Sequence, residues 1–162
     1  MGKTRIIVGI SDAKVSTDPS DVLVTYSLGS CIGVCLYDPV VHIGGMLHYQ
    51  LPASDMDRQR AQDAPFMFAD TGMKLLLGKL LSLGTNPHRL QVTLAGGATM
   101  ATGPSGFDIG KRNYLAIRKI LWSNSLIARS EDIGGSSART LYMDIADGSV
   151  TVKSVGVEKC LC

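Results

Sequence analysis

The sequence predicts an α+β fold in which mostly antiparallel β-sheets form a sandwich-like core that carries two main helices. The chain has 162 residues, a length that suits one domain. Segments rich in β-branched residues outnumber those with a helical period, and helices do not alternate regularly with strands, which argues against a doubly wound parallel sheet. Eighteen glycines indicate many tight turns and close backbone approaches.

The first third of the chain is expected to form strands. They cover residues 5–9, 22–27, 31–37 and 43–49. A polar loop of sequence STDPSD separates the first two, and Asp38-Pro39 closes the third. Because the connection between the third and fourth strands is short, we expect these two to pair antiparallel.

The middle of the chain should contain a loop, a helix and a strand. Residues 53–64 are polar and lack a period, so we expect an exposed loop. A helix is expected over residues 65–83, since Pro65 suits a first turn and Gly84 a stop. Its apolar residues recur at helical spacing: Met67, Leu75, Leu76, Leu80 and Leu83. A strand at 89–95 then leads into Gly96-Gly97.

The last third should add a second helix and further strands. We expect a helix at about 109–124 with Asp108 as its cap, and a strand near 126–132. A hairpin should follow, with strands at 140–145 and 150–155 around a turn at Ala146-Asp147-Gly148. Residues 1–162 thus form a single domain, with 156–162 as a flexible tail.

Composition excludes several classes of function. A formal net charge of +2 gives no electrostatic reason to expect nucleic acid as a partner. No stretch approaches the ~18 apolar residues that a membrane span needs, and the N-terminal apolar run lacks a small-residue cleavage site. We therefore expect a cytoplasmic protein without membrane insertion, in which the cysteines stay reduced.

Cys31 follows a Leu-Gly-Ser turn at the mouth of an apolar strand, so it is either a small buried hydrophobe or a nucleophile. A nucleophilic thiol needs its thiolate stabilised, usually by an imidazole. The chain offers His42, His48 and His88, of which His48 lies on the strand expected to pair with that of Cys31. Spacing alone leaves both alternatives open, a catalytic pair or two packing residues.

Other residues admit rival interpretations. Cys35 shares a strand face with Cys31, so a zinc site built from these and Cys160 and Cys162 is conceivable, although the spacing favours Cys35 as a core residue. Gly96-Gly97 could present backbone amides to an oxyanion or simply turn the chain. Lys111 and Arg112 could bind an acidic partner or be a solvated helix start, and GPSG at 103–106 lacks the Gly-Lys-Ser/Thr of a phosphate loop.

Six segments in order give a resemblance to a known family. They are TYSLGSCIGVCLYDP, GGMLHYQLP, LAGGATM, FDIGKRN, EDIGGSSART and DGSVTVKS, within a match that runs from about residue 5 to residue 155. The chain thereby resembles the chemoreceptor glutamine deamidase family, CheD, which is related in fold to the deamidating cytotoxic necrotizing factors. The resemblance implies a catalytic cysteine at Cys31, a histidine at His48, 17 positions later, and a threonine at Thr25, six positions earlier.

The resemblance also implies an activity and partners. Cys31 would attack the side-chain amide of a receptor glutamine, release ammonia and form a thioester that water hydrolyses to glutamate, with backbone amides around Ser30 holding the oxyanion. Neither metal nor cofactor is expected. Implied partners are the cytoplasmic helices of methyl-accepting chemotaxis receptors and a CheC-type phosphatase, and hydrolysis of receptor methyl esters is a further implied activity. The alternative is a non-catalytic adaptor that binds receptors or CheC and modulates the chemotaxis kinase complex.

Overall fold

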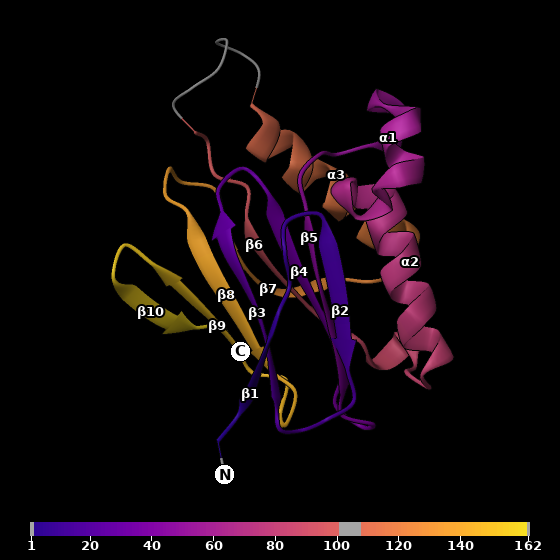
Figure 1. The fold of residues 1–162 in the computed structure, drawn as a ribbon, viewed down its shortest axis with the longest axis vertical. Coiled ribbons are helices and arrows are strands. Elements are labelled where there is room, and N and C mark those ends of the chain that lie inside the picture. The colour runs from indigo at the N-terminus through magenta and orange to yellow at the C-terminus, as the bar shows by residue number, and fades with distance from the viewer. Residues whose placement is uncertain (1, 101–107, 162) are drawn as a thin grey trace.

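Two five-stranded sheets lie face to face in a computed structural model that describes residues 2–100 and 108–161 (Figure 1). Sheet A has the order β1 (Thr4–Ile7), β3 (Asp21–Leu28), β8 (Arg139–Asp144), β9 (Val150–Ser154) and β10 (Val157–Cys160). Sheet B has the order β2 (Asp12–Ser16), β5 (Ile43–Tyr49), β4 (Ile32–Asp38), β6 (Gln91–Gly96) and β7 (Ala128–Ile133).

The predicted α+β class with mostly antiparallel sheets is confirmed. Among the described strands, β1 with β3 and β6 with β7 run parallel, and the remaining neighbours run antiparallel. The expected antiparallel pair of β4 and β5 lies at the centre of sheet B, with Gly33 opposite His48. Each sheet therefore combines local hairpins with strands that are distant in the sequence.

The helices cover the outer face of sheet B (Figure 1). The longer ones are α2 (Ala69–Ser82) and α3 (Ile109–Ser123), beside a short α1 (Arg58–Asp63) and the 3₁₀ turns η1 (Ser54–Met56), η2 (Pro65–Met67) and η3 (Pro87–Arg89). The expected cap is confirmed, since the Asp108 carboxylate accepts a hydrogen bond from the Lys111 N–H.

Strands β4 and β5 are buried on both faces because each lies between the other sheet and the helices. Side chains alternate along a strand, so Ile32, Val34 and Leu36 pack toward the helices whereas Cys35 and Tyr37 pack between the sheets. Polar side chains on the inward face of these strands are consequently removed from water, and His48 is one of them.

Several elements differ from the sequence-based expectation. Strand β2 was not predicted, because its alternation is short and adjoins a polar loop. The segment expected to be a loop at 53–64 contains η1 and α1. The helix expected from Pro65 begins at Ala69, since the backbone is extended at Phe68. Of the apolar residues that recur at helical spacing, Leu75 and Leu83 are exposed, whereas Met73, which lies outside that set, is buried.

The C-terminal segment also departs from the expected flexible tail. Val157–Cys160 form β10, which pairs antiparallel with β9. Val155 and Gly156 both have positive φ, as in the two-residue turns that suit the twist of a hairpin. The pattern of apolar residues did not predict β10, because this strand is short and its side chains are exposed.

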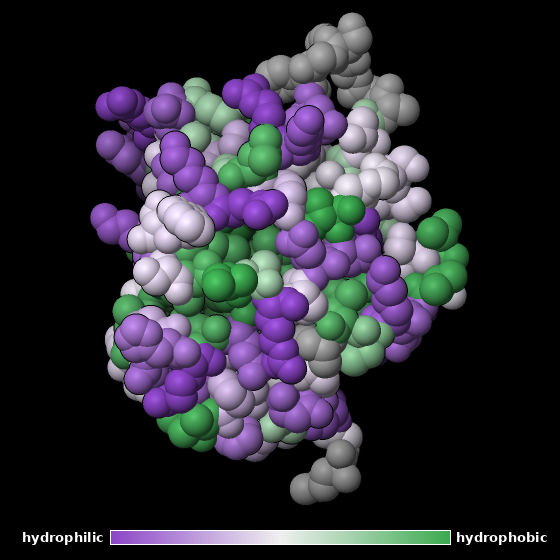
Figure 2. Space-filling model, turned by 180° about the vertical axis from the view of Figure 1, so that it is seen from behind, coloured by the Kyte–Doolittle hydropathy of each residue, from purple (hydrophilic) through white to green (hydrophobic). Residues whose placement is uncertain are grey.

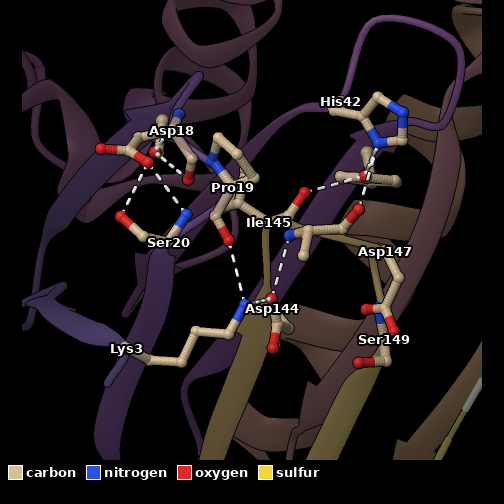
Figure 3. A network of polar contacts seen from close by, with 12 residues as sticks. Lys3, Asp18, Pro19, Ser20, His42, Asp144, Ile145, Asp147 and Ser149 are labelled. Atoms are coloured by element: carbon tan, nitrogen blue, oxygen red, sulfur yellow. Dashed lines mark hydrogen bonds and ion pairs between the residues drawn. The ribbon is translucent and has the colours of Figure 1, made fainter. Parts of the chain in front are cut away.

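One end of the sandwich is closed by a polar network (Figure 3). The Lys3 ammonium donates to the Pro19 carbonyl and to the Asp144 carboxylate at 3.0 and 3.1 Å. At the turn between β4 and β5, His42 Nδ1 lies 3.1 Å from the Ala146 carbonyl oxygen. His42 thus occupies the opposite end of β4 from Cys31.

The surface mixes hydrophilic and hydrophobic side chains, as the face behind that of Figure 1 shows (Figure 2). Trp122, Ile127, Val155 and Val157 are among the most exposed large apolar residues. In the part of the chain that the structure describes, no helix combines the length and the apolar character that crossing a membrane requires.

Asp38 has a side chain that is fully buried, where its carboxylate accepts hydrogen bonds from the Arg89 guanidinium and from the backbone N–H groups of Asn86 and Val40. Burial alone would raise its pKa, but these hydrogen bonds outweigh burial and lower the pKa to about 2. Because this pKa lies below the ordinary 3.8, Asp38 stabilises the fold above about pH 4, and that contribution is lost as the pH falls toward 2.

We expect Asp38→Ala to reduce the free energy of unfolding at pH 7 by about 3 kcal/mol, because Arg89 and two N–H groups lose a buried acceptor. The loss of stability between pH 4 and pH 2 should be smaller in the variant than in the wild type. Urea unfolding followed by circular dichroism at several pH values measures both effects. Equal stability of the two proteins at pH 7 would contradict this account.

Candidate active site

Strand register brings Cys31 and His48 to the same end and the same face of sheet B. Gly33 pairs with His48 across β4 and β5, and Cys31 lies two residues before Gly33, so the side chains share a face. The Cys31 side chain is partly buried and packs on the cluster between the sheets, whereas His48 is fully buried. The cysteine thus forms the accessible edge of a site whose imidazole is enclosed.

Thr25 reaches this site from sheet A. Its hydroxyl lies 2.7 Å from His48 Nδ1 and 2.7 Å from the Val8 carbonyl oxygen. The register of β3 against β8 shifts directly after Thr25, and Ser27 there has a φ of 62°. This bulge ends the regular ladder beside the site.

These two contacts determine the imidazole tautomer. A hydroxyl carries one hydrogen, and the Val8 carbonyl can only accept, so the Thr25 hydroxyl donates to Val8. His48 Nδ1 must then carry the hydrogen that it donates to Thr25 Oγ1. His48 Nε2 is left with a lone pair, and it has no hydrogen-bond partner among the described residues. It is therefore placed to accept a proton.

Burial sets the protonation of both groups. It lowers the pKa of His48 to about 4. Burial raises the pKa of Cys31, and the residue's own backbone N–H opposes that effect in part by stabilising the thiolate. At neutral pH the resting site therefore holds a neutral imidazole and a thiol rather than an imidazolium–thiolate pair.

Residues 29–31 form a segment that we call the Cys31 loop. The carbonyl groups of this loop accept hydrogen bonds from neighbouring elements. The Ala98 N–H donates to the Gly29 carbonyl at 2.9 Å, and the Gly97 N–H donates to the Cys31 carbonyl at 2.8 Å. The Gly97 N–H is therefore already bound within the fold, so of the two alternatives for Gly96-Gly97 the structure favours a turn of the chain over an oxyanion donor at Gly97.

Gly96 permits this close approach. It has a φ of 115°, and a Cβ built there would lie 2.1 Å from the Cys31 carbonyl oxygen. The buried Arg139 supports the same segment, since its guanidinium donates to the Gly96 and Gly134 carbonyls at 3.3 and 2.6 Å. The Gly96-Gly97 segment thus supports the Cys31 loop directly, and residues 134–139 support it through Arg139.

Asn113 is the site residue that the sequence analysis missed. Its side-chain amide donates to the Ser30 carbonyl at 2.9 Å and to the Gln50 carbonyl at 2.8 Å, and it is fully buried. One signal in the sequence could have identified it. Asn113 is a polar residue on the face of α3 that also carries the buried Gly110, Ile117 and Leu121.

Other candidates lie apart from this site. Cys35 is buried in the core, as expected, and His88 lies in η3. Lys111 and Arg112 are exposed on α3, and GPSG at 103–106 falls outside the described residues. Across residues 2–100 and 108–161, no group of three or more His, Cys, Asp and Glu side chains is placed to hold a metal ion.

Comparison with known proteins identifies relatives of the whole chain. Residues 50–154 match the family model described as CheD chemotactic sensory transduction. A protein of Solibacter usitatus named "Probable chemoreceptor glutamine deamidase CheD" is 47% identical over 155 residues, which cover 96% of this chain and 92% of that protein. A "Probable chemoreceptor glutamine deamidase CheD 1" of Syntrophus aciditrophicus is 46% identical over 93% of this chain and 94% of its own.

We expect Cys31 to react slowly with iodoacetamide at neutral pH, because burial raises the pKa of its thiol and leaves His48 uncharged. Its alkylation rate should rise steadily above pH 8, and at pH 7 it should be lower than that of the exposed Cys160. Peptide mass spectrometry after timed alkylation between pH 5 and 10 measures both rates. A plateau of Cys31 reactivity between pH 5 and 8 would instead indicate a resting imidazolium–thiolate pair.

Proposed function

The chain belongs to the CheD chemotactic sensory transduction family, and on that basis we propose that it is a cysteine-dependent hydrolase that deamidates glutamine side chains of chemoreceptors. The relatives' names supply the substrate class. The observation that carries the mechanism is the hydrogen bond between Thr25 and His48 Nδ1, which leaves Nε2 able to take a proton on the strand face shared with Cys31.

In the first half of the reaction, a receptor glutamine carboxamide binds at the exposed edge of Cys31. His48 Nε2 takes the thiol proton as the sulfur attacks the amide carbon, and the carbonyl π electrons move onto oxygen. The resulting oxyanion is held by backbone N–H groups at Ser30 and Cys31. The imidazolium returns its proton to the departing nitrogen, so ammonia leaves and a thioester remains.

Water completes the cycle. His48 Nε2 takes a proton from water as it attacks the thioester carbon, and the C–S bond breaks after a second oxyanion. The sulfur recovers its proton and the glutamine has become a glutamate. Thr25 keeps the imidazole in one tautomer throughout, which is the role of the third member of a triad.

The same acyl chemistry applies to receptor glutamyl methyl esters, with methanol as the leaving group. The proposed partners are the cytoplasmic helices of methyl-accepting receptors, which places the enzyme in the cytoplasm, and a CheC-type phosphatase. Hydrolysis of the ester would appear as methanol released from a methylated receptor fragment.

We expect a chemoreceptor cytoplasmic fragment incubated with the protein to gain about one mass unit per modified glutamine, at sites mapped by peptide mass spectrometry. Cys31→Ala should abolish the gain because it removes the nucleophile. Cys160→Ala is the matched control, because it removes an exposed thiol outside the site and should leave the rate unchanged.

An unmodified receptor fragment that nevertheless binds the protein would contradict this proposal. If Cys31→Ala also bound the fragment as tightly as the wild type and restored signalling, the alternative of a non-catalytic adaptor for receptors or CheC would be favoured.

We expect Thr25→Val to reduce kcat about 10–100-fold, because the branched apolar side chain fills the same space but cannot accept from His48 Nδ1. Thr25→Ser keeps the hydroxyl and should retain most of the activity. Deamidation kinetics with a receptor fragment compare the two. Loss of activity in Thr25→Ser with activity retained in Thr25→Val would contradict this account and show that the Thr25 methyl group, rather than its hydroxyl, matters.

A further inference from the structure

The Cys31 loop is held through three successive carbonyl groups, two of them bound by the segment that follows β6 and one by α3. Gly29 accepts from Ala98 and Cys31 accepts from Gly97, both through backbone N–H groups. The carbonyl between them, that of Ser30, accepts from a side chain instead, the amide of Asn113 on α3 at 2.9 Å. A side chain therefore decides how the peptide unit that joins Ser30 to Cys31 is turned.

That peptide unit carries the Cys31 N–H. The described peptide bonds are all trans, and in a trans unit the N–H points opposite to the C=O. With its carbonyl directed to Asn113, the unit directs the Cys31 N–H away from α3. Among the described residues, the N–H groups of Ser30 and Cys31 donate to no backbone or side-chain acceptor outside their own residues.

The Asn113 side chain is oriented by its contacts. Its Nδ2 donates to both Ser30 and Gln50, and a flipped amide would place its oxygen against two carbonyl oxygens. Its Oδ1 is buried without a hydrogen-bond partner among the described residues. An apolar residue at this helix position would avoid burying an oxygen without a partner. The presence of an amide is therefore explained by the hydrogen bonds that it donates to the Ser30 and Gln50 carbonyls.

We propose that Asn113 is a positioning residue for acyl transfer at Cys31. It turns the Ser30–Cys31 peptide so that the Cys31 N–H donates to the oxyanion, and it ties this peptide to Gln50, two residues after His48. The proposal rests on the cysteine chemistry proposed above and adds the residue that sets its oxyanion donor.

Two reactions of Cys31 separate this role from a structural one. Iodoacetamide is attacked at a saturated carbon, so the C–S bond forms as iodide leaves and no oxyanion arises. p-Nitrophenyl acetate is attacked at a carbonyl carbon, so a tetrahedral oxyanion forms before p-nitrophenolate leaves. A residue that orients the oxyanion donor affects the second reaction and spares the first.

We expect Asn113→Ala to slow the Cys31-dependent release of p-nitrophenolate about 10–100-fold, with the Cys31→Ala rate subtracted as background. Its alkylation by iodoacetamide should stay within about threefold of wild type. In receptor deamidation, kcat should fall similarly while KM is unchanged, because the oxyanion exists only after substrate has bound. Asn113→Leu, which keeps the volume without the donor, should behave in the same way.

Tyr49→Phe is the matched control. The Tyr49 hydroxyl donates to the Asn113 backbone carbonyl at 2.6 Å, in the same contact between β5 and α3, and its loss leaves the Asn113 amide in place. We expect a lower Tm with both reactions of Cys31 at wild-type rates.

Parallel loss of both reactions in the Asn113 variants, or loss of neither, overturns the proposal. So does failure of both variants to fold, since Asn113 would then be required by the fold itself, and so does a wild-type protein without a Cys31-dependent ester reaction. A wild type that reacts with the ester but modifies no receptor overturns the proposed function alone, and the ester comparison still decides the role of Asn113.

Discussion

The hydrogen bond from His48 to Thr25 is the contact on which the site depends, because it joins the two sheets at the point where the imidazole is buried. His48 belongs to β5 and Thr25 to β3, so the bond crosses the space between the sheets. A buried imidazole without a partner would be costly, and one with a freely chosen partner could adopt either tautomer. The further bond from Thr25 to the Val8 carbonyl removes that choice. One threonine thereby fixes the position of the imidazole and leaves Nε2 as the nitrogen with a lone pair.

A second constraint is the close approach of backbones around Cys31. Gly96 lies so near the Cys31 carbonyl that any side chain there would collide with it. This approach lets the amides of Gly97 and Ala98 hold the Cys31 loop from one side while Asn113 holds it from the other. Loops without such anchors exchange among conformations, whereas acyl transfer requires donors placed within a few tenths of an ångström. The loop is thus held by two main-chain contacts that depend on glycine and by one side-chain contact from Asn113.

The sequence predicted what depends on local pattern. Alternation and turn residues identified β4 and β5 and their antiparallel pairing, which put His48 on the strand beside that of Cys31. Long-range contacts could not be predicted from periodicity. Thr25 looks like an ordinary strand residue, and only the family resemblance predicted a role for it. The contacts of Asn113 could not be predicted from the helix pattern, because its partners Ser30 and Gln50 are more than 60 residues away in the chain.

Enclosure of the base also bears on how the thiol is activated. A histidine whose pKa lies near 4 is a weak base, and a thiol with a raised pKa is a weak acid, so full proton transfer in the resting site is unfavourable. In the proposed mechanism, transfer becomes favourable when it accompanies attack, because the negative charge then moves from sulfur to an oxygen that accepts hydrogen bonds from backbone N–H groups. Sulfur reactivity is thereby tied to a carbonyl substrate lying correctly against the Cys31 loop. The same burial that raises the pKa of Cys31 keeps its side chain in the thiol form, which oxidants attack more slowly than a thiolate.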